Sequence, residues 1–151
     1  MRVLVQKVSK ASVKIEQEVY NSIGDGLLLF VGFSIDDHHT IIDKMVEKLI
    51  KLRILEDEHG KINNGILESN LEILSISQFT LYAATKKGRR PSFSMSANPE
   101  VAREYYDYFN EQLNNHIPVK TGQFQADMQV ELINDGPFTI MLDSEEYQWH
   151  K

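Results

Sequence analysis

The sequence contains no cysteine among its 151 residues. This excludes disulfides, thiolate metal sites and a cysteine nucleophile, and it fits a reducing compartment. No apolar run approaches the roughly 20 residues that a membrane-spanning helix needs. The N-terminal stretch MRVLVQKVSKASV is interrupted by charges too often for a signal peptide. We therefore expect a soluble, cytoplasmic protein that does not bind a membrane.

Metal-binding and nucleotide-binding motifs are also missing. The five histidines form no H-E-x-x-H pattern and adjoin no carboxylate cluster at ligand spacing, so we expect no metal. We expect His38 and His39 on the solvated side of a helix start. Neither a Walker loop nor a G-x-G-x-x-G motif occurs. Positive charge is scarce, since 16 basic and 22 acidic residues give a net charge of −6. This argues against wrapping a long nucleic acid but leaves room for a local basic patch.

The first half of the chain predicts strands followed by a helix, within one domain spanning residues 1–151. Alternating apolar residues predict a strand at 2–15, with a bulge near 6–8 where the alternation slips. Strands at 18–23 and 27–33 flank Gly24-Asp25-Gly26, which predicts a hairpin. The apolar run LLLFVGF predicts burial on both faces of the second of these strands. Apolar residues at helical spacing predict a helix at 41–50, with a capping box at residues 34–37.

The second half predicts more strands and a second helix. We expect a short strand at 53–55, a polar loop at 57–64, a long strand at 71–83 and a loop at 86–96. Asn98-Pro99-Glu100 predicts a helix start. ELINDGPFTIML, residues 131–142, predicts two strands, 128–134 and 138–143, joined as a hairpin by an Asp-Gly turn. This order favours an α+β fold with a mostly antiparallel sheet and two main helices.

Two hydroxyl side chains in the long strand invite a nucleophile hypothesis. Ser77 and Thr80 would each need an activating base, and the nearest histidine in sequence, His59, lies on a loop. Ordinary strand residues are the simpler interpretation. Strand alternation sends Ser77 and Phe79 to one face and Gln78 and Thr80 to the other. Ser77 and Thr80 can therefore line one pocket only if the strand bends or ends between them.

A basic segment follows that strand. Four of the five residues at 86–90 are Lys or Arg, in a chain that is acidic overall. Such a run is often a solvated loop. Its position beside the candidate pocket strand favours instead a phosphate-binding role, because Lys and Arg bind phosphates and Arg does so bidentately.

Pro137 stands where the second strand of the expected hairpin should donate hydrogen bonds, and proline has no N–H. A plain turn would explain it. A functional alternative is that a Gly136-Pro137 bond, especially a cis one, holds two successive carbonyl oxygens rigidly against a ligand.

Several stretches together resemble the D-aminoacyl-tRNA deacylases. They are SQFTL at 77–81, GRRPSF at 88–93, TGQFQADM at 121–128 and NDGPFT at 134–139, supported by RVLVQKVSKASVKIE, IGDGLLLFVG and YYDYF. The resemblance covers nearly the whole chain and leaves a C-terminal tail, 143–151, unmatched. It implies a barrel-like β-core and a cytoplasmic homodimer that uses no metal or cofactor. It also implies hydrolysis of the ester between a D-amino acid, or glycine, and the 3′ end of tRNA, with L-aminoacyl-tRNA rejected.

The resemblance also implies roles for individual residues. Ser77, Gln78, Phe79 and Thr80 would form the pocket for the amino acid and the terminal adenosine. Phe79 would offer its N–H to the ester oxygen, and Thr80 would position groups rather than attack. Gly136 and Pro137 would form a cis element that enters the partner subunit's site and selects chirality. Further substrate contacts would come from Asn134, Arg90, Pro91, Ser92, Phe93 and Met128. Apart from the resemblance, we assign tRNA phosphate contacts to Lys86, Lys87 and Arg89 because of their charge.

Three alternatives remain open at this point. The chain could be a non-catalytic module that binds an RNA acceptor end, or an esterase with Ser77 or Thr80 as covalent nucleophile. It could also be a structural dimer in which Gly136-Pro137 is only a turn.

Overall fold

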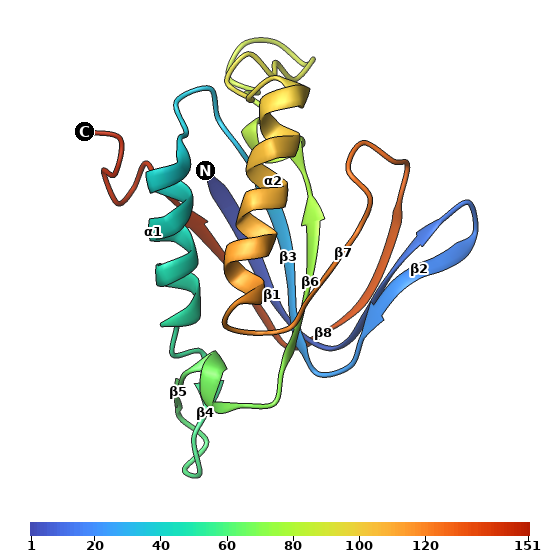
Figure 1. The fold of residues 1–151 in the computed structure, drawn as a ribbon, viewed down its shortest axis with the longest axis vertical. Helices are drawn as coiled ribbons and strands as arrows, with labels where there is room; N and C mark the ends of the chain where they lie inside the picture. The colour runs from blue at the N-terminus through green and yellow to red at the C-terminus, as the bar shows by residue number, and fades with distance from the viewer.

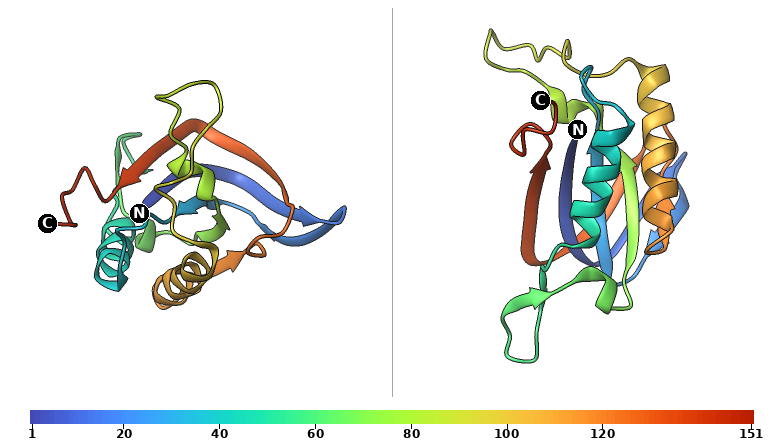
Figure 2. Two further views of the ribbon diagram at one scale, coloured as in Figure 1. Left: turned by 90° about the horizontal axis from the view of Figure 1, so that it is seen from above. Right: turned by 60° about the vertical axis from the view of Figure 1, so that its left-hand side comes forward.

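The computed structural model describes all residues, Met1–Lys151. Its elements are β1 (Arg2–Ile15), β2 (Glu18–Ile23), β3 (Gly26–Gly32), α1 (His39–Ile50), β4 (Leu55–Glu56), β5 (Ile62–Asn64), β6 (Glu72–Ser77), α2 (Pro99–Asn114), β7 (Val119–Thr121) and β8 (Gln129–Asp143), with 3-10 turns at Ile66–Glu68 and Phe79–Tyr82. Six strands form a curled, nearly closed sheet, and α1 and α2 cover one of its faces (Figures 1 and 2). The predicted α+β class, with two main helices and a barrel-like sheet, is confirmed.

The sheet is mixed, which corrects the prediction of a mostly antiparallel one. β1 pairs antiparallel with β2, β3 and β8, whereas β6 pairs parallel with both β3 and β7. Parallel neighbours need a long crossover connection. Here α1 lies in the connection from β3 to β6, and α2 lies in the connection from β6 to β7. Each of the two predicted helices thus connects a pair of parallel strands. The sequence analysis did not predict β7.

The predicted hairpin at Gly24-Asp25-Gly26 is wrong. Ala11 pairs with Ile23 and Val8 pairs with Gly26, so β2 and β3 follow one another along the same edge of β1. The chain reverses earlier, at Glu16 and Gln17, whose φ angles are 51° and 68°. Positive φ at both central residues is the geometry of the tight turns that suit hairpins. Neither residue is Gly, Asn or Asp, so this turn could not be recognised from its residue types.

The predicted hairpin around Asp135-Gly136 is wrong as well. Asn134 pairs with Val8 and Thr139 pairs with Gln6, so both halves of β8 run in one direction along β1. Residues 135–138 stand opposite Lys7 alone, so β8 has an unusually long bulge at this point. The β1–β8 register shifts at residues 6–8, where a bulge in the first strand was predicted, but the extra residues lie in β8 and the β1–β3 register is continuous there. The missing N–H of Pro137 therefore lies in the bulge, where no ladder bond is needed.

Two apolar cores hold the sheet. The larger lies under the helices and includes Ile41, Met45 and Leu49 of α1, while the smaller lies on the other face of the sheet. Leu27 and Leu29 of β3 belong to the larger core and Leu28 to the smaller, and all three are fully buried. Burial of β3 on both faces is confirmed, and each such leucine contributes about 1.5–3 kcal/mol of hydrophobic stabilisation.

The two helices begin differently. Asn98 caps α2 as predicted, since its Oδ1 accepts a hydrogen bond from the Val101 N–H at 3.0 Å. The predicted capping box before α1 is wrong, because the N-cap is His38, without a side-chain cap bond. Asp37 is buried instead and accepts from the Ser34 N–H at 2.7 Å and the Met1 amino group at 2.6 Å. His38 and the neighbouring His39 are exposed, as expected.

Two local predictions shift slightly. The short strand expected at 53–55 is β4, and the expected polar loop at 57–64 includes β5, which pairs with β4 as a small ribbon. No helix is long and apolar enough to cross a membrane.

Candidate active site

A pocket of about 780 Å³ opens where β3 and β6 end. Four segments form its wall: residues 31–33, residues 76–79, the stretch from Phe93 into the first turn of α2, and residues 124–130. Eleven of its 19 lining residues are hydrophobic, and Asp127 is the only one with an ionisable side chain. The pocket therefore suits an uncharged or singly charged group of moderate size.

The pocket depends on an early end to β6. The Gln78 N–H donates to Val31 O at 2.8 Å, and the chain then turns, with Leu81 N–H bonded to Gln78 O and Ala83 N–H to Thr80 O. The predicted strand 71–83 is therefore wrong after Ser77. Because strand alternation stops there, Ser77, Gln78 and Phe79 can all contribute to one wall.

Neither hydroxyl candidate is paired with a base. Thr80 is exposed and lies outside the pocket wall, and its Oγ1 accepts a hydrogen bond from Gln78 Nε2 at 2.6 Å. Ser77 lines the pocket but its hydroxyl makes no hydrogen bond within the chain. A Ser or Thr nucleophile requires an adjacent base. The geometry thus offers a pocket residue at Ser77 and a turn-stabilising residue at Thr80.

Two aromatic rings form the rim. Phe79 and Phe93 meet edge to face with ring centroids 5.0 Å apart, and Ser96 Oγ donates to Phe79 O at 3.2 Å. Phe79 is 56% exposed, which leaves its ring accessible to a ligand. Exposed aromatic faces of this kind are suited to stacking on a nucleic-acid base.

The basic loop leaves the rim and returns to it. Ala84 and Ser92 exchange backbone hydrogen bonds of 2.8 and 2.9 Å at its base. Within it the side chains of Lys86, Lys87, Arg89 and Arg90 are exposed and form no ion pair. Of the residues at 90–93 expected to contact substrate, only Phe93 lies in the pocket wall; Arg90, Pro91 and Ser92 lie outside it.

Met128 closes the inner side of the pocket, and it fits because of Gly122. A Cβ on Gly122 would lie 2.7 Å from Met128 Sδ and 3.0 Å from Ile76 Cδ1. Only glycine lets the chain approach Met128 and Ile76 so closely.

The buried Tyr106 lies behind this wall. Its hydroxyl donates to Ser75 O at 2.7 Å, and burial raises the pKa of Tyr106 to about 12. Tyr106 is therefore neutral near pH 7 and supports the wall.

The bulge in β8 is exposed and fixed by one side chain. Asn134 Oδ1 accepts from the Phe138 N–H at 3.0 Å, and its Nδ2 donates to Thr139 Oγ1 at 2.8 Å. The Gly136–Pro137 bond is cis, and Gly136 has a φ of 139°, a conformation that favours glycine. Both residues are exposed.

The bulge does not reach the pocket of its own chain. It stands opposite Lys7, which pairs with Leu27 of β3, whereas the pocket begins at Val31 and Gly32. Five residues of strand at about 3.3 Å each separate Leu27 from Gly32, or about 16 Å. The roles of Asn134 in substrate binding and of Gly136 and Pro137 in chiral selection therefore stay predictions.

Comparison with known proteins decides the family. A family model described as D-Tyr-tRNA(Tyr) deacylase matches residues 4–143. The chain belongs to this deacylase family. The resemblance found in the sequence is confirmed, and so is the expected enzyme class, a hydrolase acting on D-aminoacyl-tRNA.

Two solved structures agree with the deacylase fold. One, described as "c-Myc DNA Unwinding Element Binding Protein", is 39% identical, with a TM-score of 0.90, and the match covers 95% of this chain and 98% of that one. The other, described as a probable eukaryotic D-amino acid tRNA deacylase, is 19% identical, with a TM-score of 0.81, over 93% and 97% of the two chains. At 19% identity the second match bears on the fold alone.

Sequence reasoning missed part of the candidate pocket. Asp127, Gln125 and Asn98 line it, yet none was expected to do so. Asp127 and Gln125 lie inside the family motif TGQFQADM, which was the available signal. Asn98 was recognised only as a helix cap. No group of three or more His, Asp or Glu side chains gathers at metal-ligand spacing.

Proposed function

We propose that this deacylase hydrolyses the ester that joins a D-amino acid to the 3′ end of its tRNA. It would accept glycyl-tRNA and spare L-aminoacyl-tRNA, which is chiral proofreading in translation. The observation that carries the proposal is the pocket at Ser77–Gln78–Phe79, in a chain of the deacylase family. Its volume of about 780 Å³ suits an aminoacyl group with its terminal adenosine.

The reaction would be direct attack of water on the ester carbonyl. The C–O bond to the tRNA 3′ oxygen breaks, the amino acid leaves as its acid, and the proton lost by water goes to the 3′ oxygen. Phe79 is the first residue of a helical turn, so its N–H has no acceptor within that turn. We propose that it donates to the oxyanion that develops on the carbonyl. The tRNA's terminal 2′-OH would assist the proton transfer.

A homodimer would complete the site. β8 pairs only with β1, so its other edge is unpaired along its length, and Ile133 and Met141 on it are 49% and 42% exposed. An unpaired edge is an available surface for a second chain. We propose that two copies associate there and that the bulge of each enters the pocket of the other.

The enzyme would discriminate between D- and L-aminoacyl-tRNA by sterically excluding the L side chain. The carbonyl oxygens of Gly136 and Pro137 would occupy the space that an L side chain needs. A D side chain points away from them and glycine has none, so both would pass. Rejection by a steric clash can discriminate more strongly than a missing contact.

The basic loop would hold the acceptor end of the tRNA. Lys86, Lys87 and Arg89 are exposed and unpaired, so they can bind phosphates without first breaking an ion pair. Affinity for the tRNA should then fall as salt rises. The cytoplasm, where aminoacyl-tRNA is used, is the proposed location.

Single-turnover deacylation of D-Tyr-tRNA, L-Tyr-tRNA and glycyl-tRNA tests the proposal. Fast release from the D and glycyl esters, with the L ester spared, supports it. Equal cleavage of the D and L esters would leave a hydrolase without chiral selection. Binding of tRNA without cleavage would favour the RNA-binding module instead.

A further inference from the structure

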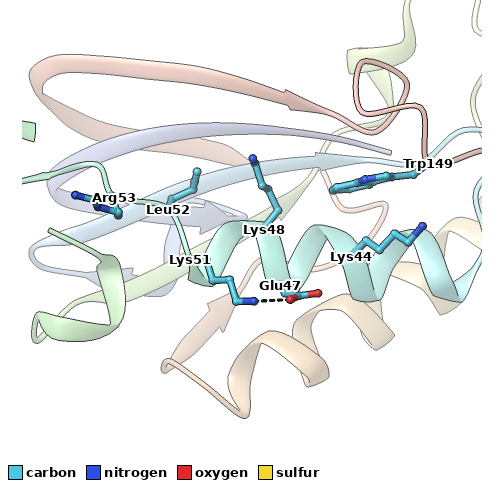
Figure 3. A pocket seen from close by; sticks show the side chains of 7 residues that line it. All are labelled: Lys44, Glu47, Lys48, Lys51, Leu52, Arg53 and Trp149. Carbon is cyan, nitrogen blue, oxygen red and sulfur yellow. Dashed lines mark hydrogen bonds and ion pairs between the residues drawn. The ribbon is translucent and has the colours of Figure 1, made fainter. Parts of the chain in front are cut away.

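A second hollow, distinct from the active-site pocket, lies between α1 and the C-terminal tail. It measures about 470 Å³, and we call it the α1 groove (Figure 3). Lys44 and Lys48 line it from α1, Lys51 and Arg53 lie just beyond the end of the helix, and Trp149 covers it from the tail. Trp149 lies outside the family match, which covers residues 4–143, whereas the other residues of the groove lie within it.

The charge of the α1 groove is opposite to that of the whole chain. It carries four cations, and its one acidic residue, Glu47, is ion-paired with Lys51. Lys44 and Lys48 are four residues apart on α1, about 6 Å along the helix, and neither forms an ion pair. A chain with a net charge of −6 has thus concentrated unneutralised positive charge on one face of one helix.

Aromatic rings adjoin these cations. Tyr147 and Trp149 pack with centroids 4.6 Å apart, and Lys48 Nζ lies 4.9 Å from the centre of the Tyr147 ring. Trp149 is half-buried against the larger core, which fixes its position while leaving part of the ring at the groove. A row of cations beside a fixed aromatic ring is the combination that binds single-stranded nucleic acid, through phosphate contacts and base stacking.

We propose that the α1 groove binds an RNA strand, with phosphates on Lys44 and Lys48 and a base against Trp149. That the RNA is the body of the tRNA substrate rests on the proposed function, whereas the groove itself does not. The groove would then add affinity for whole tRNA without contacting the ester.

Trp149 supplies the readout, because it is the only tryptophan in the chain. Titration of uncharged tRNA should change its fluorescence saturably. Replacing Lys44 and Lys48 together by Gln should weaken binding and reduce the slope of log K against log salt by about 1.5, since each phosphate contact contributes about 0.7–0.9. The matched control replaces Lys10 and Lys14 by Gln. Lys10 is exposed and Lys14 is half-exposed; both lie on β1, outside the α1 groove, and their replacement should leave binding unchanged.

Three results would overturn the proposal: tRNA retained on a filter without a change in Trp149 fluorescence, equal weakening by the control pair, or competition by inorganic tripolyphosphate as effective as that by RNA. Competition by tripolyphosphate would make the groove a small-anion site.

Measurements of hydrolysis separate this proposal from the proposed function. D-Tyrosyl-adenosine is too short to span both sites, so the Lys44/Lys48 variant should cleave it as wild type does, with a raised KM only for D-Tyr-tRNA. Failure of the wild-type protein to cleave either substrate would reject the proposed function and leave the RNA-binding result standing.

Discussion

The pocket beside Ser77 and the bulge at Gly136 are built in opposite ways. The pocket is a hollow lined by side chains from four segments of the chain. The bulge is exposed backbone, fixed in shape by the side chain of Asn134. Apolar side chains can repack around a substitution, so changes in the pocket should alter affinity and rate gradually. A backbone element has no such freedom, so changes in the bulge should alter discrimination sharply.

Gly136→Ala should give the largest effect. At a φ of 139° an alanine is strained, and its Cβ would lie 2.9 Å from Phe138 N, so the bulge must change shape. We expect the preference for D-Tyr-tRNA over L-Tyr-tRNA to fall by about 100-fold in single-turnover rates, with a stability loss of about 1–3 kcal/mol. Gly24→Ala is the matched control, because no atom lies within 4 Å of its added Cβ. An unchanged preference in Gly136→Ala would mean that the bulge plays no part in chiral selection.

Asn134→Ala tests whether the bulge must be held rigid. It removes both hydrogen bonds of the Asn134 side chain, which should lower the free energy of unfolding by about 1–2 kcal/mol and the D-over-L preference by roughly tenfold. Asn21→Ala is the control. It removes a side-chain bond to Thr121 O of 2.7 Å in another part of the sheet and should cost stability without relaxing the preference. Equal relaxation in both variants would point to general destabilisation.

The same two regions show what could be predicted from the sequence. Features that depend on neighbouring residues were predicted correctly from the sequence. Examples are the Asn98 cap of α2 and the burial of β3 on both faces. The Gly-Asp-Gly signal marks the break between β2 and β3, and the Asp-Gly signal marks the bulge within β8, yet the chain reverses at neither. β1 is 14 residues long and accepts β2 and β3 in line on one edge and all of β8 on the other. That pairing is decided by partners distant in sequence, which a turn signal does not encode.

The candidate site also has a part that could be predicted from the sequence and a part that could not. Ser77, Gln78 and Phe79 could be found because they are contiguous, and the end of β6 brings them to one wall. Thr80 was grouped with them by its motif, but the turn that follows Gln78 places it outside. Asp127 reaches the pocket from a segment 50 residues later in the chain, and only the curled sheet brings it there.

Asp127→Asn sharpens the description of the pocket. Asp127 has the only ionisable side chain in the wall, and an aminoacyl ester carries a protonated amino group that this carboxylate can pair with. We expect KM for D-Tyr-tRNA to rise about fivefold with little change in kcat, as for a partly exposed ion pair worth about 1 kcal/mol. N-acetyl-D-Tyr-tRNA lacks the charge, so wild type and variant should cleave it equally. Asp107→Asn, on the exposed side of α2, is the control. A fall in kcat instead would make Asp127 a proton acceptor in the reaction.

Thr80→Ala should give the smallest effect, and for that reason it separates two mechanisms. Thr80 lies outside the pocket wall, and its side chain bonds only to Gln78 Nε2. If water attacks the ester, its loss should slow single-turnover deacylation of D-Tyr-tRNA less than about threefold, through slight loosening of the turn that carries Phe79. Loss of a true nucleophile costs about 1000-fold or more. Ser77→Ala and a search for an acyl-enzyme by mass spectrometry complete the test. A trapped acyl group on either hydroxyl, with a loss of that size, would establish covalent catalysis in place of direct attack by water.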